Sequence, residues 1–472
     1  MSSRPLRPPG FRSDVVMKLP AELWHNIYNQ LTRSDYHNLS LTCSSFRSSI
    51  RPFLFHKLQF MISAKPRSIH PPTGQRYCLL TDLDTSLRRL NHYALAPESV
   101  RECTFMVKQA TREWPMGAYA HEGGERLIDE FFNVLPRFSS CTRLALSGLV
   151  LDAEKLDRIG RVEALSDLEL EKCLVLCGPY ECRPIPLTNF CIDGDGSYLV
   201  PKGDHITVYD NYFSIVDPLT VRSIKIMVVG PRILHCLLYS PSYVYDLDAT
   251  FCSLVKLSLP HRATASLYFV PFLERCPNLR EITFHPLEFY DKADPDALAE
   301  PLPPSLLLNL QKFVGPAFTF TPFTTFAVSY INLTGTCLPS TFQALLRQLH
   351  HPSRVREFRM SVIPLTPTLF RLLWGRLKRL ESLELWMGQR APPNKRDEKP
   401  ITWEALLKEL PEVAAPTLRR LTLHMAFMNA RMFGDAWMDA WGEALRKKCE
   451  KLESVDFTFE DNMYSWSWPR KK

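Results

Sequence analysis

The sequence predicts a mixed α/β repeat fold: a short bundle of three helices, followed by an irregular solenoid of helix–strand repeats with a parallel concave sheet. Near the chain start, apolar residues recur at the helical spacing of three and four residues. Over residues 96–460, an apolar triplet with the spacing L-x-x-L-x-L recurs, often after a helical segment. At 472 residues the chain is too long for one ordinary core, which favours several domains or one domain with an extended array.

The composition is that of a folded chain with unusual turns. Hydrophobic residues make up 45% of the chain and charged residues 23%, both ordinary globular values. Proline is frequent, at 38 residues, and glycine is scarce, at 18, so most turns are expected to depend on proline. The sequence contains no glycine-rich phosphate-binding motif and no G-x-S-x-G motif. No cofactor and no catalytic residue are predicted.

No feature of the sequence predicts secretion or membrane insertion. Residues 1–14 are basic, rich in proline and expected to be disordered, and they lack the apolar segment of a secretory signal. No apolar run approaches the ~18 residues of a membrane span. The 13 cysteines form an odd set without the framework of a small disulfide-bonded domain. Reduced thiols in the cytoplasm, the nucleus or both fit this pattern.

The segment LPAELWHNIYNQL, residues 19–31, predicts a first helix with an unusually wide apolar face. On a helix its large apolar side chains form two adjacent stripes, Leu23–Ile27–Leu31 and Trp24–Tyr28. A small bundle cannot cover so wide a face alone, and an exposed apolar patch usually marks a protein partner. The alternative is that the later chain of the same protein buries this face.

Two further short helices are predicted before residue 60. The segment TRSD, residues 32–35, supplies a break and a capping residue for the second helix. A third helix should carry Cys43, Phe46 and Ile50 on one side and stop at Pro52. Residues 53–60 then close the unit with more aromatic residues.

Residues 15–60 resemble an F-box. The resemblance rests on an L-P-x-E-φ start, a paired Ile and Leu, an acidic residue opening the second helix, and a Leu/Cys/aromatic series before a final Leu. It implies a three-helix domain that binds the Skp adaptor, and through it a cullin-RING ubiquitin ligase. The adaptor contacts that the resemblance implies are Leu19, Pro20, Leu23, Ile27, Leu31, Leu39, Leu41, Phe46 and Phe55.

Residues 61–95 are predicted to form a linker and a helix that leads into the array, because they contain the Pro- and Gly-bearing segment AKPRSIHPPTGQR. In the array, residues 96–460, the central positions of the clear triplets are Cys103, Leu144, Leu168, Phe190, Ile224, Leu257, Ile282, Phe358, Leu383, Leu421 and Val455. Weaker copies lie near Leu310–Phe313 and Ile331–Leu333. Alternation of the last two apolar positions predicts a short strand in each copy.

The array resembles a degenerate leucine-rich repeat of the kind found in fungal F-box proteins. Helix, turn and strand follow one another in many copies, and one such unit cannot bury its apolar face without a stacked neighbour. The period is irregular, and the regular Asn of the family is missing. Residues 461–472 form a C-terminal tail with aromatic and basic residues, which a capping strand or a frayed end explains as well as a nucleic-acid or membrane contact does.

The concave face of the predicted sheet is predicted to be a protein-binding surface. Beside the strand aliphatics, five basic and nine acidic residues point outward, so a nucleic-acid groove is not favoured there. The candidate substrate-binding residues are Arg143, Glu169, Lys225, Lys256, Glu281, Arg359, Glu384 and Trp386. An ordinary solvated surface is the alternative.

Metal binding is not predicted. Cys173, Cys177, Cys182 and Cys191 form the nearest approach to a zinc site, but they lack the tight pairs that structural zinc usually requires. Buried cysteines along a repeat core are the commoner arrangement. The segment DGDG, residues 193–196, lacks the later Glu of a calcium loop.

Together these features predict a non-catalytic substrate receptor of a Skp–cullin–F-box ubiquitin ligase, acting in ubiquitin-dependent protein degradation. The F-box would hold the adaptor, and the repeats would capture a protein substrate. Two alternatives stay open: an F-box scaffold without a role in degradation, and a repeat-built nucleic-acid binder. No membrane partner is expected.

Overall fold

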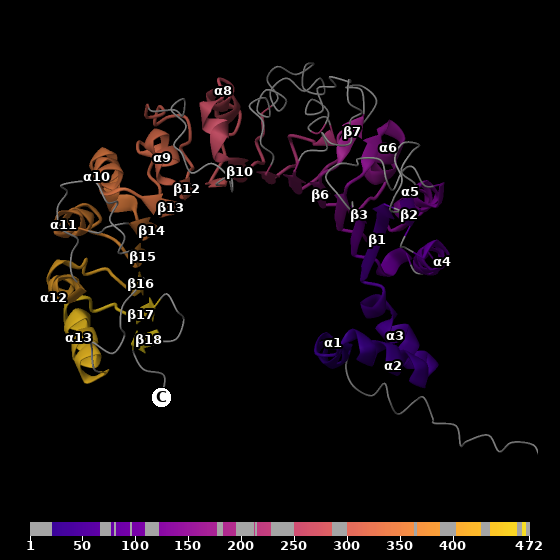
Figure 1. Ribbon diagram of the computed structural model, residues 1–472, viewed down its shortest axis with the longest axis horizontal. Coiled ribbons are helices and arrows are strands. Elements are labelled where there is room, and N and C mark those ends of the chain that lie inside the picture. Colours follow the sequence, from indigo (N-terminus) through magenta and orange to yellow (C-terminus); the bar gives the residue numbers. More distant parts are fainter. Residues whose placement is uncertain are drawn as a thin grey trace, which may run out of the picture. The chain divides into compact units, whose positions relative to one another are not determined.

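A computed structural model describes residues 21–66, 77–79, 82–94, 97–108, 122–176, 183–194, 212, 215–227, 250–285, 300–362, 366–387, 403–425, 435–459 and 465–468 (Figure 1). Internal contacts divide the chain into an N-terminal unit, Met1–Leu187 with Asp195–Val208, and a C-terminal unit, Thr188–Gly194 with Tyr209–Lys472. Among the helices of these described stretches, none has the length and apolar character needed to cross a membrane.

The N-terminal unit begins with the helices α1 (Ala21–Asn29), α2 (Arg33–Thr42) and α3 (Ser44–Leu54). Thr32 caps α2 through a reciprocal capping box with Asp35, which satisfies two backbone N–H groups of the first turn. These hydrogen bonds from Thr32 lower the pKa of the Asp35 carboxyl. The Cys43 sulfur accepts a hydrogen bond from the Phe46 N–H and so caps α3.

The predicted end of the third helix at Pro52 is wrong. Helix α3 continues through Pro52 to Leu54, and the N–H of Phe55 donates to the Arg51 carbonyl at 3.1 Å. A proline has a φ that suits a helix, although it lacks an N–H and its ring crowds the carbonyl four residues before it. In the last turn these effects do not end the helix.

The rest of the N-terminal unit is a sheet with helices beside it. The strands, in spatial order, are β2 (Tyr77–Leu79), β1 (Lys57–Pro66), β3 (Glu102–Lys108), β4 (Arg143–Ser147) and β6 (Asp167–Glu171). Apart from the antiparallel β1–β2 pair, the neighbours are parallel. The other elements are α4 (Leu83–Ala94), η2 (Pro97–Ser99), α5 (Glu122–Val134), η3 (Leu135–Arg137), α6 (Ala153–Gly160) and a small parallel pair, β5 (Val150–Asp152) with β7 (Leu174–Leu176).

The C-terminal unit is a second run of parallel strands in sequence order. These strands are β8 (Asn189–Asp193), β9 (Ser223–Ile226), β10 (Lys256–Pro260), β11 (Glu281–His285), β12 (Lys312–Pro316), β13 (Tyr330–Cys337), β14 (Glu357–Val362), β15 (Ser382–Met387), β16 (Arg420–Met425) and β17 (Ser454–Phe459). Strand β18 (Ser465–Trp468) closes the series and pairs antiparallel with β17.

Helices connect the strands of the C-terminal unit. They are η8 (His261–Ala265), α8 (Phe269–Glu274), α9 (Ala317–Phe320), η9 (Thr321–Phe323), α10 (Pro339–Gln348), η10 (Pro352–Arg354), α11 (Pro367–Arg376), α12 (Trp403–Val413) and α13 (Asp435–Lys448). Helices α10 to α13 lie on one side of strands β13 to β17 (Figure 1). A parallel crossover of this kind buries one sheet face under the helices.

The strands predicted from the apolar triplets are confirmed. Within each unit their central residues pair in register, as in Leu257↔Ile282↔Phe313↔Ile331. The aliphatic positions are buried, whereas the residues between them are exposed or half-buried. Each strand therefore presents one row to the helices and one row to the open face of its sheet. The assignment of these strands to leucine-rich repeats stays a prediction.

The first strand of the sheet was not predicted. Strand β1 starts at Lys57 and pairs in parallel with β3, with Leu58 opposite Cys103 and Phe60 opposite Phe105. Residues 61–66, expected in a linker, therefore belong to the sheet. The spacing Phe55-x-x-Leu58-x-Phe60 is itself a copy of the apolar triplet, and it lies inside the segment that matched the F-box pattern.

Aromatic rings fill much of the space between the strands and the helices. In the N-terminal unit, the Phe105 ring centroid lies 4.5 Å from that of Phe131 and 6.0 Å from that of Phe60. In the C-terminal unit, Phe313 contacts Phe320 at 4.7 Å and Phe323 at 5.3 Å. Such tilted contacts between aromatic rings contribute stability to a core in addition to that gained by burying apolar area.

Candidate functional site

The two apolar stripes of α1 have different environments. Trp24 and Tyr28 pack against α3: the Trp24 ring lies 5.4 Å from Phe46, and the Tyr28 ring lies 5.1 Å from Phe53. The hydroxyls of Tyr28 and Ser49 are hydrogen-bonded at 2.8 Å, and Tyr28 is only 3% exposed. The aromatic stripe thus forms the inside of the bundle.

The aliphatic stripe of α1 faces solvent. Leu23 is 47% exposed and Ile27 is 39% exposed, and residues four apart lie on one face of a helix. On α2, Leu41 is 64% exposed. Contact with a partner protein would remove these aliphatic side chains from water. We call Leu23, Ile27 and Leu41 the exposed aliphatic residues of α1 and α2.

The other expected adaptor contacts that the structure describes are less exposed. Leu31, Leu39 and Phe46 are half-buried, and Leu19 and Pro20 lie outside the described residues. Phe55 is half-buried against α4, with its ring 5.5 Å from His92 and 5.0 Å from Tyr93. The sequence did not indicate this contact, because α4 lies about three dozen residues further along the chain and no local pattern joins them.

The residues expected to bind a substrate all lie on the open faces, and several contact one another. Arg143 pairs with Glu169 at 3.2 Å in the N-terminal unit. In the C-terminal unit, Lys256 pairs with Glu281 at 3.3 Å, and Arg359 pairs with Glu384 at 3.2 Å. Opposite charges on adjacent strands therefore neutralise each other. The faces are charged but carry no large field of one sign.

On the open face of the C-terminal unit, aromatic and charged side chains gather around Trp386. Its indole is 52% exposed and stacks on the His424 ring with 3.6 Å between centroids and 13° between planes. The indole N–H donates to the Glu384 carboxylate at 3.3 Å, and His424 Nε2 lies 3.1 Å from the same oxygen. We call Trp386, His424, Glu384 and Arg359 the Trp386 cluster.

A second aromatic residue extends this surface. Tyr330 lies between two cations, with Lys312 Nζ 5.2 Å and the Arg359 guanidinium carbon 5.6 Å from the ring centroid. Burial raises the pKa of the Tyr330 hydroxyl, so the ring stays neutral. Sequence reasoning missed Tyr330 and His424 because it considered mainly charged residues at these positions. Both residues stand directly beside a buried aliphatic residue of a strand. Listing every residue type at such positions, and not only the charged ones, would have found them.

A smaller polar group lies on the open face at β10 and β11. His285 is hydrogen-bonded to the Ser258 hydroxyl. Burial, together with the nearby charge of Lys225, lowers the pKa of His285, while Asp193 acts in the opposite direction. A neutral imidazole beside a serine is an ordinary hydrogen-bonded pair here, because no third group among the described residues is seen to orient the ring for catalysis.

The described residues contain no group of three metal-ligating side chains. Burial raises the pKa of the Cys173 thiol to about 12, which opposes the thiolate form that zinc requires. The Cys173 thiol instead donates to the Leu146 carbonyl at 3.3 Å. Cys177 and Cys182 lie outside the described residues, as do residues 195–196 of the DGDG segment.

Comparison with known proteins identifies one domain. Residues 16–58 match the family model described as "F-box domain". No curated protein matches the chain. One of the solved structures that match, the Toll–Spatzle complex from Drosophila, is 12% identical and covers 86% of this chain and 55% of that chain. The present chain thus spans about half the length of that protein, and the TM-score of 0.26 supports no conclusion about the fold.

The chain therefore carries an F-box domain in helices α1 to α3. F-box domains in general bind the Skp adaptor of cullin-RING ubiquitin ligases. Proteins with this domain are generally non-catalytic.

Proposed function

We propose that this protein is a substrate-recognition subunit of a Skp–cullin–F-box ubiquitin ligase. The observation that carries the proposal is the F-box match at residues 16–58 together with the exposed aliphatic residues of α1 and α2. Aliphatic side chains in water are stabilised by burial, at about 25 cal/mol per Å² of apolar area. An adaptor that covers Leu23, Ile27 and Leu41 supplies that burial.

The open face of the C-terminal unit is the proposed substrate-binding surface. Trp, Tyr and Arg are the residue types that dominate binding hot spots, and Trp386, Tyr330 and Arg359 lie there together. Their contacts hold them in place before binding, which lowers the entropy lost on association. In this proposal the strands and helices are degenerate leucine-rich repeats of the fungal F-box type.

The proposed mechanism is positioning. A substrate held on the repeats has a raised effective concentration near the ubiquitin carrier that the ligase recruits. The catalytic groups belong to other subunits, and this chain supplies only the two binding surfaces.

The first test is adaptor binding by the double variant Leu23→Asp/Ile27→Asp. Two carboxylates placed in an apolar interface should weaken binding by about 100-fold or more. Both side chains are exposed, so the variant should keep the wild-type unfolding temperature. The measurement is the dissociation constant for a purified Skp adaptor.

Leu308→Asp is the matched control, because Leu308 is 80% exposed and lies far outside the F-box match. It should bind the adaptor like the wild type. Equal adaptor affinity in the folded double variant and the wild type would overturn the proposed adaptor surface.

A further inference from the structure

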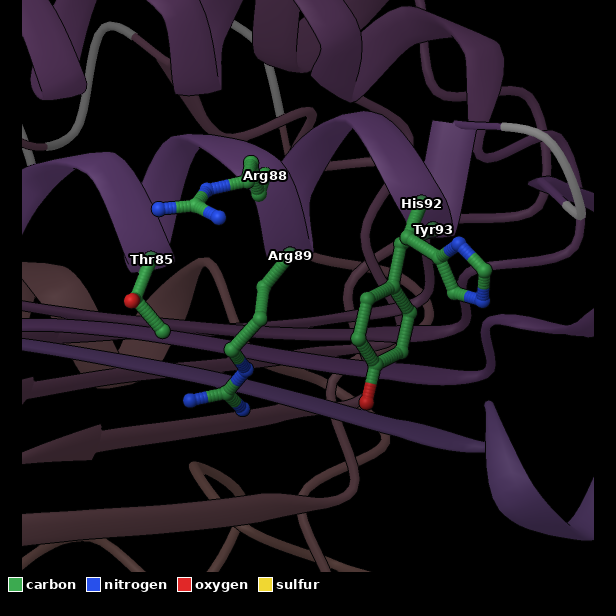
Figure 2. A pocket seen from close by; sticks show the side chains of 5 residues that line it. All are labelled: Thr85, Arg88, Arg89, His92 and Tyr93. Atoms are coloured by element: carbon green, nitrogen blue, oxygen red, sulfur yellow. The ribbon is translucent and has the colours of Figure 1, made fainter.

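Helix α4 carries a cavity that the proposed function does not use. The cavity measures about 310 Å³ and is lined by Thr85, Arg88, Arg89, His92 and Tyr93 (Figure 2). The side chains of Arg89 and Tyr93 extend from α4 toward the strands below it (Figure 2). This volume is at the lower end of small-molecule sites, so it suits a compact ligand or a single functional group.

The lining is positively charged. Among the described residues it contains two arginines and a histidine but no carboxylate. Within the described residues, the structure shows no ion pair for either guanidinium. Asp82 accepts hydrogen bonds from the hydroxyl and the N–H of Thr85 at 2.6 and 3.1 Å, and the charge of Arg88 also helps to lower the pKa of the Asp82 carboxyl. Asp82 therefore offsets part of the Arg88 charge, whereas no carboxylate among the described residues pairs with Arg89.

The cationic side chains are held in place. Arg88 Nε donates to the Asp84 carbonyl at 3.2 Å, which leaves its terminal N–H groups available. The Arg89 guanidinium lies over the Phe60 ring, 5.7 Å from its centroid, and cation–π contact of this kind orients the group. Tyr93 is 4% exposed, and its hydroxyl donates to the Lys57 carbonyl at 3.3 Å. The cavity thus has a buried tyrosine on one side and two guanidinium groups, each oriented by a contact within the protein.

From this geometry we propose that the α4 cavity binds a phosphate monoester group. A guanidinium presents paired N–H donors that match two oxygens of a phosphate, and such charge-assisted hydrogen bonds are the strong ones. A phosphate dianion also places negative charge beside the two guanidinium groups of the cavity. The group comes either from a small phosphorylated metabolite or from a phosphorylated side chain of a captured protein, since both present the same oxygens to the cavity.

Binding at this cavity would act on the F-box junction. His92 and Tyr93 line the cavity and also contact the Phe55 ring at the end of α3. A ligand that fixes these two side chains therefore stabilises the contact between α3 and α4. Occupancy of the cavity should raise the unfolding temperature of the full chain.

The test is calorimetric titration of the full chain with O-phosphoserine, with inorganic phosphate and with serine, all at constant ionic strength. Both phosphates should bind at one saturable site, and serine should not bind. The variant Arg88→Gln/Arg89→Gln should weaken phosphate binding about tenfold or more, because hydrogen bonds to charged groups contribute about 1.5–3 kcal/mol each. The phosphate affinity of Arg89→Lys should lie between those of the wild type and the double variant, because lysine keeps the positive charge but lacks the paired N–H donors of a guanidinium.

Lys378→Gln/Arg379→Gln is the matched control, because it removes two adjacent exposed cations elsewhere. It should bind phosphate like the wild type. Tighter binding of a phosphoserine peptide than of ribose 5-phosphate assigns the site to a captured protein, and the reverse order assigns it to a metabolite. Absence of saturable phosphate binding, or equal binding by the folded Arg88/Arg89 variant and the wild type, overturns the proposal. Adaptor binding is a separate readout, which neither result alters.

Discussion

At the scale of single residues, the two positions that follow the neighbouring strands β4 and β6 share a left-handed backbone conformation. Gly148 follows β4 and Lys172 follows β6, and the strand pairing places them at equivalent positions. Both have positive φ, 69° and 49° respectively, and the Gly148 N–H donates to the Glu171 carbonyl at 2.9 Å. This left-handed conformation suits glycine and strains other residues. The same turn is therefore relaxed at one copy and strained at the next.

Gly148→Ala should lower the free energy of unfolding by about 1–3 kcal/mol, since a Cβ there would lie 2.7 Å from the Val107 carbonyl oxygen. Lys172→Gly should have the opposite sign and raise it by up to about 1 kcal/mol. Urea unfolding of the two variants checks both expectations. Destabilisation by both substitutions would contradict a shared turn conformation.

At the scale of helices and strands, the pattern of burial could be predicted from the sequence and the lateral contacts could not. The period-two alternation around Leu257 or Leu383 marks a strand by itself, because burial on one face is a local property. The pairing of Arg359 with Glu384 depends on which residues of two separate strands lie side by side, and loops of varying length set that register. Phe55-x-x-Leu58-x-Phe60 was missed as a strand signal because the F-box pattern already accounted for those residues.

Helix α11 offers a test of local capping. Its N-cap, Thr366, is 5% exposed, and its hydroxyl accepts the Leu369 N–H at 3.3 Å. Thr366→Ala should cost about 1 kcal/mol of stability, because that N–H loses its partner. Thr366→Ser keeps the hydroxyl and should lose much less. Thermal unfolding of both variants checks the difference, and equal losses would show that packing of the Thr366 methyl group matters more than the cap.

At the scale of the whole molecule, the sequence indicated two separate binding surfaces, and the structure adds their composition. The F-box helices expose aliphatic residues, while the open face of the C-terminal unit exposes a paired set of charges around Trp386 and Tyr330. The α4 cavity could not be predicted, because the sequence does not show that these cationic side chains and Tyr93 line one cavity. The identity of a substrate cannot be deduced from residue types on an open face, since no code relates them to a partner.

Trp386→Ala should show that partner capture and adaptor binding depend on different surfaces. We expect it to reduce capture of partner proteins while leaving adaptor binding unchanged, because its indole is exposed on the open face. Trp437→Ala, at an exposed tryptophan of α13, is the control. Quantitative mass spectrometry of purified complexes, with and without proteasome inhibition, measures the difference.

The Leu23→Asp/Ile27→Asp variant completes this comparison. It should retain the captured proteins that Trp386→Ala loses, but those proteins should no longer be ubiquitinated through this chain. Unchanged ubiquitination of the partners in a variant that cannot bind the adaptor would favour a scaffold over a receptor.

The direct continuation of α3 into β1 makes the F-box a poor exchangeable cassette. Only Phe55 and His56 separate Leu54, where the helix ends, from Lys57, where the first strand begins. A recombinant chimera joined at the family boundary, residue 58, would replace the start of β1 and the Phe55 ring that contacts α4. Successful domain grafting would have to carry β1 and α4 along with the three helices, so in this chain the inherited module is larger than the recognised motif.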